Sequence, residues 1–202
     1  MIKTAVGETG QKERKRPARE KLLASASTLF YADGLAPAGI DAVTADAGVA
    51  KRSLYNNFAS KSELVTAYLN EPHRGWLGLC HRRLEQAAGP ANRLLAVFDA
   101  YTDHTHLEYE RGFRGCGLLN AAAEPPVGDP GRVIVTLRQE GVERLLAEHL
   151  EEIAPTRTAL SASTAKRLYF LLERAMARAS LEGNDSCLTE ARGMAREMVS
   201  AL

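Results

Sequence analysis

The chain has 202 residues, of which 45% are hydrophobic and 25% are charged, and its formal net charge at pH 7 is +1. This length allows one large domain or two modest ones, and the hydrophobic content is sufficient for a packed core. No run of eighteen apolar residues occurs, and residues 1–16 lack the apolar stretch of a secretion signal. We therefore expect a globular protein of the cytoplasm with no membrane partner.

Cysteine usage and charge distribution add two weaker indications. The three cysteines, Cys80, Cys116 and Cys187, are widely spaced and form no C-x-x-C pair, which argues against a disulfide framework and a structural zinc site. Residues 1–70 carry ten Lys or Arg and seven Asp or Glu, whereas the remainder has a small acidic excess. The N-terminal third is therefore the end more suited to an anionic partner.

The first sixty residues predict three helices in close succession. Apolar residues from Leu22 to Phe30 recur at three- and four-residue spacing, and Gly34 follows as a stop signal. A second helix is expected to begin near Gly39 or Ile40 and to end at Gly48, which suits a tight turn because it has no side chain.

The third predicted helix, over residues 51–58, carries a polar, basic and aromatic face that a buried helix would not need. Leu54 and Phe58 lie four residues apart and should anchor it to the first helix. Ser60 and Glu63 then form a capping box, in which Ser60 can accept a hydrogen bond from the Glu63 amide while the Glu63 side chain reaches back, and a longer helix is expected to begin there.

Residues beyond 70 predict long amphipathic helices. The pair Gly89-Pro90 ends one segment, a short helix is expected over 118–123, and Asp129 and Pro130 form a helix N-terminus. The last two helices have regular apolar stripes, made by Leu168, Leu171, Leu172, Ala175, Met176 and Ala179 and by Leu188, Ala191, Ala195, Met198 and Leu202. With no strand-like alternation, the fold class is all-α, with about nine helices.

The motifs L-L-A-S-A-S-T-L-F-Y-A-D-G, V-T-A-D-A-G-V-A-K-R-S-L-Y-N-N-F and S-K-S-E-L follow one another between Pro17 and Leu69. In this order and spacing they resemble the N-terminal domain of the tetracycline-repressor (TetR) family of transcriptional regulators. The resemblance implies a three-helix helix-turn-helix DNA-binding domain over residues 16–76, with the helix-turn-helix proper at 39–58. It also implies a C-terminal helical effector-binding and dimerisation domain over residues 77–202.

A recognition helix enters the major groove by its N-terminal half, which gives roles to individual residues. We expect Lys51, Arg52 and Ser53, with Asn56 one turn on, to face base edges or phosphates, and Arg52 can donate two hydrogen bonds to guanine. The family commonly contacts phosphate at the position of Tyr55, and Lys61 at a helix N-terminus is suited to the same task. Ordinary surface or packing roles remain the alternative for each.

Three features qualify this assignment. Gly39 and Ala50 stand where the family often has a Thr and a Ser cap, and each loss removes a side-chain acceptor worth up to about 1 kcal/mol. Basic residues at or before the first helix could follow the DNA backbone or could belong to a disordered tail. They are Lys12, Arg14, Lys15, Arg16 and Arg19.

The C-terminal helices offer candidates for an effector pocket and a dimer interface. Aromatic and polar residues at helical spacing could line a cavity or could simply be core; we list Phe98, Tyr101, His104, Phe113, Cys116, Asn120 and Tyr169. Cys116 could be a redox-sensing thiol, although a packing role is favoured. By the resemblance, the last two helices form a four-helix dimer interface, to which we assign Leu168, Leu172, Ala175, Ala179, Ala191, Ala195 and Met198.

No catalytic motif, cofactor-binding loop or metal-ligand pattern emerges. The pair His104-x-His106 places its rings about 200° apart on a helix, which excludes chelation of one metal ion. The sequence therefore predicts a non-enzymatic regulator, most often a repressor in such a family, that binds a near-palindromic DNA operator as a homodimer and responds to a small molecule. The alternatives are a small-molecule-binding or enzymatic helical protein with a vestigial helix-turn-helix, and an unliganded DNA-architectural protein.

Overall fold

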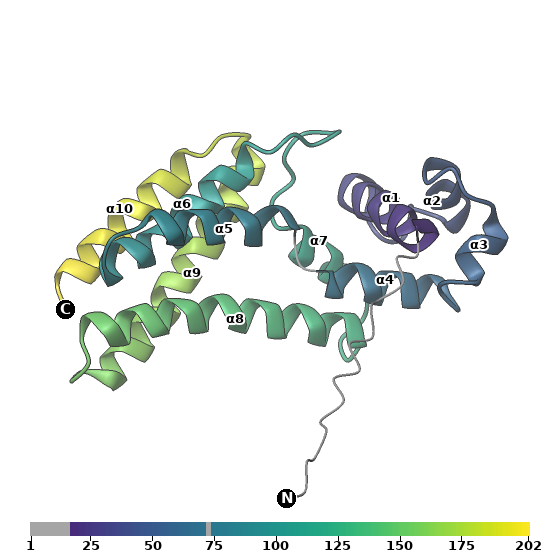
Figure 1. Cartoon of the computed structure of the whole chain (residues 1–202). Helices are drawn as coiled ribbons and strands as arrows, with labels where there is room; N and C mark the ends of the chain where they lie inside the picture. Colours follow the sequence, from purple (N-terminus) through teal and green to yellow (C-terminus); the bar gives the residue numbers. More distant parts are fainter. Residues whose placement is uncertain (1–16, 72–73) are drawn as a thin grey trace, which may run out of the picture.

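The computed structural model describes residues 17–71 and 74–202, and over these residues the regular structure is entirely helical. The helices are α1 (Pro17–Asp33), α2 (Ile40–Asp46), α3 (Lys51–Tyr55), α4 (Lys61–Asn70), α5 (Arg74–Gln86), α6 (Pro90–Thr105), α7 (Gly117–Ala123), α8 (Pro130–Ile153), α9 (Thr158–Glu182) and α10 (Ser186–Ser200). Helices α1 to α4 gather at one end and α5, α6, α9 and α10 at the other, while α7 lies between them and α8 extends from one end to the other (Figure 1). The all-α fold class is confirmed.

The described part of the chain holds ten helices where about nine were expected. The helix that begins after Ser60 is short, because α4 ends at Asn70 and a separate α5 begins at Arg74. Pro72 lies between them in the sequence, and proline lacks the backbone N–H that would continue a helix. Helix α3 also ends earlier than predicted, at Tyr55.

Two hydrophobic clusters account for the two ends of the molecule. The first is built mostly from α1 to α4, with Phe30, Leu54 and Phe58 among its buried side chains, and it also takes Leu118, Ala121 and Val135 from α7 and α8. The second joins α5, α6, α8, α9 and α10 around buried residues such as Phe98 and Leu172. Burial of apolar surface in these clusters is the main stabilising contribution.

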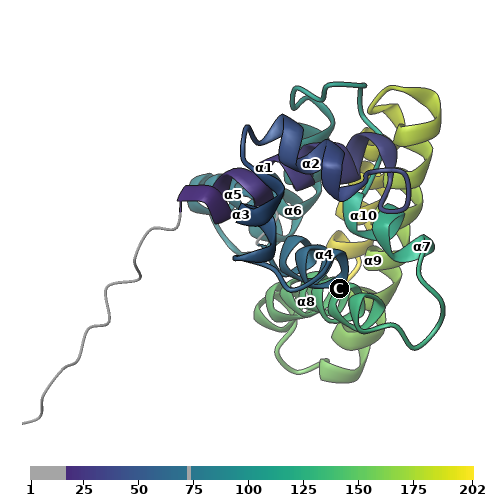
Figure 2. The same ribbon diagram turned by 90° about the vertical axis from the view of Figure 1, so that its right-hand side faces the viewer.

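Helix α8 and the segment around α7 connect the two ends (Figure 1), and Figure 2 views the molecule from the end with α1 to α4 in front. The N-terminal part of α8 packs on α4 and its remainder packs on α6 and α9. Helix α7 packs on both α1 and α8. Gly117, at the start of α7, approaches α1 so closely that an added Cβ would lie 2.9 Å from the Tyr31 ring. A displacement of α7 or α8 therefore alters the packing of both hydrophobic clusters.

Candidate nucleic-acid interface and ligand cavity

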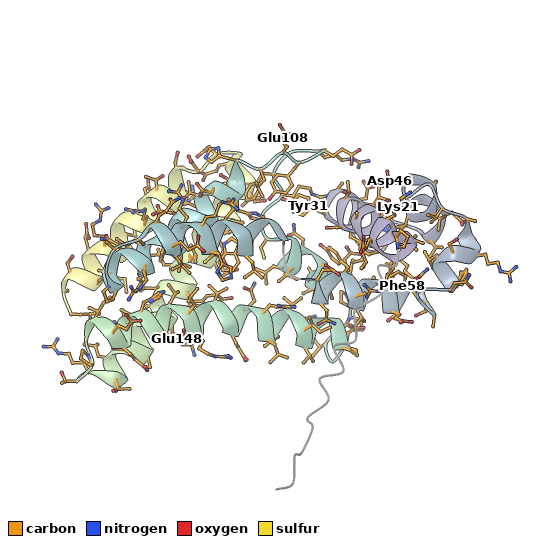
Figure 3. The ribbon with its side chains drawn as sticks, viewed as in Figure 1. Lys21, Tyr31, Asp46, Phe58, Glu108 and Glu148 are labelled. Carbon is orange, nitrogen blue, oxygen red and sulfur yellow. The ribbon has the colours of Figure 1, made fainter. Side chains whose placement is uncertain are left out.

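Helix α3 is held on the surface by two buried anchors. Leu54 and Phe58 are 0% and 2% exposed and pack in the N-terminal cluster against α1. The Arg19 guanidinium lies 5.3 Å from the centre of the Phe58 ring, a cation–π arrangement (Figure 3). These contacts fix the rotation of α3 about its axis, so its remaining side chains face solvent.

The five residues predicted to read DNA lie on or directly after α3. Lys51, Arg52, Tyr55 and Asn56 are exposed, and Ser53 is half-buried. Tyr55 is 50% exposed, which is unusual for so large a ring. A short helix with cationic, aromatic and amide side chains on its solvent face has the chemistry to contact phosphates and base edges together.

Lys51 already has an anionic partner. Its ammonium lies 2.7 Å from an Asp41 carboxylate oxygen, and the hydrogen bond to Asp41 raises the pKa of Lys51. Both side chains are well exposed, so the pair contributes little to stability. Lys51 can therefore exchange Asp41 for a phosphate at low cost.

The turn between α2 and α3 has the geometry that its glycine predicts. Gly48 has a φ of 62°, in the left-handed region that favours glycine, and its N–H donates to the Ala45 carbonyl. The two helices also lack side-chain caps, as predicted. Gly39 and Ala50 occupy the N-cap positions of α2 and α3, and neither has a side-chain acceptor there. A hydrogen bond from Ser25 to Asp46 ties α2 back to α1.

Lys61 opens α4 beside α3. The predicted capping box precedes it: Ser60 accepts from the Glu63 N–H at 3.1 Å, and Glu63 accepts from the Ala59 N–H at 2.5 Å. The Lys61 ammonium donates to the Ala36 carbonyl at 3.2 Å. It is half-buried, so its charge lies at the edge of the surface that α3 presents. Of the basic residues proposed to follow the DNA backbone, Lys12, Arg14, Lys15 and Arg16 fall outside the described residues.

A cavity of about 430 Å³ lies in the C-terminal helices, between α5, α6, α8 and the start of α7, with Met176 of α9 also on its wall. Its apolar lining includes Trp76, Leu84, Tyr101, Val142 and Leu145. This volume is in the range of small-molecule sites, which are mostly apolar with a few polar groups.

The predicted pocket residues do not all reach this cavity. Tyr101, His104 and Cys116 line it. Phe98 is fully buried in the core, Asn120 is exposed and donates to the Arg114 carbonyl, and Phe113 and Tyr169 pack at the edge of the C-terminal cluster. Sequence spacing alone could not separate ring faces that border empty space from ring faces that border other side chains.

Two titratable groups beside the cavity differ from their usual behaviour. Burial raises the pKa of the Cys116 thiol to about 11, so Cys116 is a neutral thiol at physiological pH and lacks the thiolate that redox sensing requires. Burial also raises the pKa of Glu173 to about 7. The sequence analysis missed Glu173; its one signal was a carboxylate on the apolar side of α9, between Tyr169 and Met176.

Six of the seven residues assigned to a dimer interface are buried inside the monomer. Leu168, Leu172, Ala175, Ala179, Ala191 and Ala195 are each at most 5% exposed and form the α9–α10 part of the C-terminal core, and Met198 is half-buried. Side chains that are already covered cannot also meet a second subunit. We therefore no longer assign these six residues to the dimer contact, because the strongest apolar stripe of each helix faces the interior of its own subunit.

The structure also bears on the expectations about metal binding and the membrane. His106 hydrogen-bonds Asp185 and His104 hydrogen-bonds Tyr109, so the two rings serve different local contacts. Within residues 17–71 and 74–202, no group of three His, Cys, Asp or Glu side chains is arranged to hold a metal ion. None of the helices described is long and apolar enough to cross a bilayer.

This geometry defines a helix-turn-helix protein with a helical C-terminal domain. Residues 22–68 match the family described as "Bacterial regulatory proteins, tetR family". The chain is 27% identical to SCO4454, a TetR-family regulator from Streptomyces coelicolor, with a TM-score of 0.75 over 92% of this chain and 93% of that one. The N-terminal domain is therefore that of the TetR family of regulators, and the chain as a whole is similar to TetR-family transcriptional regulators, as its motifs predicted.

Further relatives are consistent with this assignment. The chain is 29% identical over 130 residues to a protein of Mycolicibacterium smegmatis named HTH-type transcriptional activator FasR. That match spans 64% of this chain and 58% of the activator. A regulator from Cytophaga hutchinsonii has the same fold, with a TM-score of 0.81 over 95% of this chain and 98% of that chain at 18% identity.

Proposed function

We propose that this protein binds a near-palindromic DNA operator as a homodimer, acts as a repressor in the cytoplasm and is released by a small molecule bound in the C-terminal cavity. The observation that carries the proposal is the exposed face of α3, which presents Lys51, Arg52, Tyr55 and Asn56 from a helix fixed by buried anchors. A merely structural helix would have no need of such a face.

In this proposal each residue has a defined partner on DNA. Arg52 donates to a guanine edge, while Ser53 and Asn56 contact neighbouring bases. Lys51, Tyr55 and Lys61 bind phosphates, with Lys51 leaving Asp41 when it does so. Arg19, which lies against Phe58 and 4.0 Å from Glu71, is close enough to add a backbone contact.

We assign the dimer interface to the outward faces of α9 and α10. Phe170 and Leu181 of α9 are 59% and 80% exposed, and Met194 of α10 is 50% exposed. Phe170 and Leu181 are eleven residues apart, which is three helical turns and places them on one face. Large apolar side chains exposed along two packed helices are typical of a surface that another protein covers.

The cavity is placed to influence DNA binding. Cys116, Gly117 and Leu118 line it at the start of α7, and Leu118 also belongs to the N-terminal cluster. A ligand that fits the cavity best when α7 is displaced would favour a different spacing of the two recognition helices. We accordingly keep residues 16–76 as the DNA-binding domain and 77–202 as the domain for ligand binding and dimerisation.

The test is selection of DNA by the purified protein from random double-stranded fragments. The proposal predicts enrichment of an inverted repeat whose half-sites are about 34–36 Å apart, one helical turn. Recovery of fragments with no common sequence would contradict it and favour an architectural protein. Because the M. smegmatis relative is named an activator, a reporter placed behind the selected operator then tests the direction: repression supports the proposal, and activation contradicts that part of it.

A further inference from the structure

Glu173 has a buried carboxylate with no cationic partner among the described residues. Both of its side-chain oxygens are covered from solvent, and neither accepts a hydrogen bond of regular geometry from the described residues. Leaving a buried polar group unpaired is costly, so such groups are rare in folded proteins and concentrate at functional sites.

Within residues 17–71 and 74–202, no opposing charge acts on Glu173. The groups that influence it or are influenced by it are the hydroxyls of Tyr101 and Tyr169 and the thiol of Cys116. All three have a raised pKa because they are buried, so all three are neutral. The hydroxyl of Tyr101 is the one that partly favours the ionised form of Glu173. The Glu173 carboxylate therefore has no cation to pair with at this site.

Glu173 does not line the ligand cavity itself, but it interacts with two residues that do. Its neighbours Tyr101 and Cys116 both line the cavity, and so does Met176, which follows Glu173 by one helical turn. Contact between a molecule at this end of the cavity and the covered carboxylate requires these lining side chains to move. The rest of the lining there is aromatic: Trp76 packs edge-on against Tyr101, with ring centres 5.1 Å apart.

Trp76 supplies a second unpaired group. Its indole N–H is buried and has no acceptor among the described residues. The cavity thus combines an apolar volume, aromatic faces, one unused donor and one unused anionic acceptor. Aromatic faces and a carboxylate together favour a cation with an apolar body.

We propose that the effector is an apolar or aromatic molecule bearing a protonated amine, which pairs with Glu173. This inference deepens the effector role given to the cavity above and rests on it for its biological meaning. The competing occupant is an amphipathic anion, because Arg138 and Arg144 line the cavity. Glu148 lines it too, on the same helix as these arginines, and the α8 charges are therefore mixed (Figure 3).

The chain's single tryptophan makes the test direct, because Trp76 lines the cavity and its fluorescence reports occupancy. The full chain is titrated with three probes that share one apolar body: 6-phenylhexylamine, 6-phenylhexan-1-ol and 6-phenylhexanoate. The proposal predicts that the amine binds about tenfold tighter or more than either of the others, as expected for a charge-assisted hydrogen bond in a buried site. Equal binding of amine and alcohol, or tighter binding of the carboxylate, would overturn it.

Two variants locate the preference. Glu173→Gln keeps the shape of the side chain and removes its charge, so it should bring the amine down to the affinity of the alcohol while leaving the alcohol unchanged. Glu148→Gln, on α8, should retain the preference. Loss of the preference in Glu148→Gln with retention in Glu173→Gln would contradict the assignment. Circular dichroism confirms that both variants are folded before titration.

The titration contains no DNA, so it is independent of the operator experiment. Selective binding of the amine by a protein that selects no operator would remove the regulatory role and leave the site intact. Operator binding without amine selectivity would leave the regulatory role intact and overturn the amine site.

Discussion

The Glu124 carboxylate accepts a hydrogen bond from the backbone N–H of Leu35, with 2.6 Å between the two heavy atoms. Its second oxygen accepts from the Ala36 N–H, also at 2.6 Å. One side chain at the end of α7 thus holds the loop that follows α1. Nearby, the Arg114 backbone N–H donates to the Tyr31 hydroxyl at 2.7 Å, and Tyr31 stacks on Tyr109. These contacts join the segment between α6 and the end of α7 to α1 and the loop that follows it; Tyr31 is labelled in Figure 3.

Replacing Glu124 by Ala should therefore destabilise the protein. Two backbone N–H groups lose a charged acceptor, and partial solvent access limits the loss to about 1–2 kcal/mol. Urea unfolding measures the free energy directly. Glu151→Ala, an exposed carboxylate on α8, serves as the control and should change stability by less than about 0.5 kcal/mol. Equal effects of the two substitutions would remove the role given to Glu124.

The missing cap of α3 is an opportunity for stabilisation. Ala50 has the extended backbone of an N-cap residue, with φ −66° and ψ 146°, so a serine there can accept a hydrogen bond from the helix N-terminus. Ala50→Ser should raise the free energy of unfolding by about 0.5–1 kcal/mol. Ser60→Ala, which deletes the existing cap of α4, should lower it by about 1 kcal/mol. If Ala50→Ser lowers the midpoint of thermal unfolding, the geometry of this cap is wrong.

Glu173 should make stability depend on pH. Burial raises the pKa of this carboxyl from its ordinary 4.5 to about 7, so folding favours the protonated form. Its favourable contribution is complete below pH 4.5 and is lost as the pH rises through 7. Glu173→Gln should therefore gain stability over the parent at pH 8 but not at pH 4.5, by about 1–3 kcal/mol.

Urea unfolding of both proteins at the two pH values measures this difference. Burial also lowers the pKa of His149, so this residue adds its own pH dependence to the stability. Because His149 is present in both proteins, its contribution cancels in the stability difference between them. A stability difference that is the same at pH 4.5 and pH 8 would show that Glu173 is solvated in the folded state.

Helix periodicity predicted much of the fold because the signals were local. Leu54 and Phe58 are buried as their four-residue spacing indicated, Gly48 forms the turn, and Ser60 and Glu63 form the capping box. Each of these depends on residues within one or two turns of one another, so spacing contains the information.

The two candidate sites, the α3 surface and the cavity, differ in whether local sequence spacing predicts them. The exposed side chains of α3 follow from which face its anchors bury. The cavity does not, because it depends on how α5, α6, α8 and the start of α7 pack, and residues such as Phe98 fill space there instead of lining it. The residues first assigned to the dimer interface illustrate a related point: an apolar stripe shows which face of a helix is buried, but not whether its own subunit covers it.

The revised interface can be tested by charge. Leu181→Glu places a carboxylate in the proposed α9–α10 interface, where desolvation without a partner is unfavourable, and should shift the protein toward monomers. Multi-angle light scattering should give about twice the 21.9 kDa chain mass for the parent and about one chain mass for the variant. Val133→Glu, at an exposed apolar residue on α8, should leave the mass unchanged. A parent mass of one chain at micromolar concentration would contradict the dimer.

The central claim is that the exposed face of α3 binds DNA, and fluorescence anisotropy on the selected operator tests it most directly. Arg52→Ala and Tyr55→Ala should each weaken binding by about 1–3 kcal/mol, or roughly five- to 150-fold, because each removes a base or phosphate contact and leaves the buried anchors intact. Arg82→Ala, an exposed arginine on α5, should bind as the parent does. Unchanged operator affinity in folded Arg52→Ala and Tyr55→Ala proteins would contradict the account.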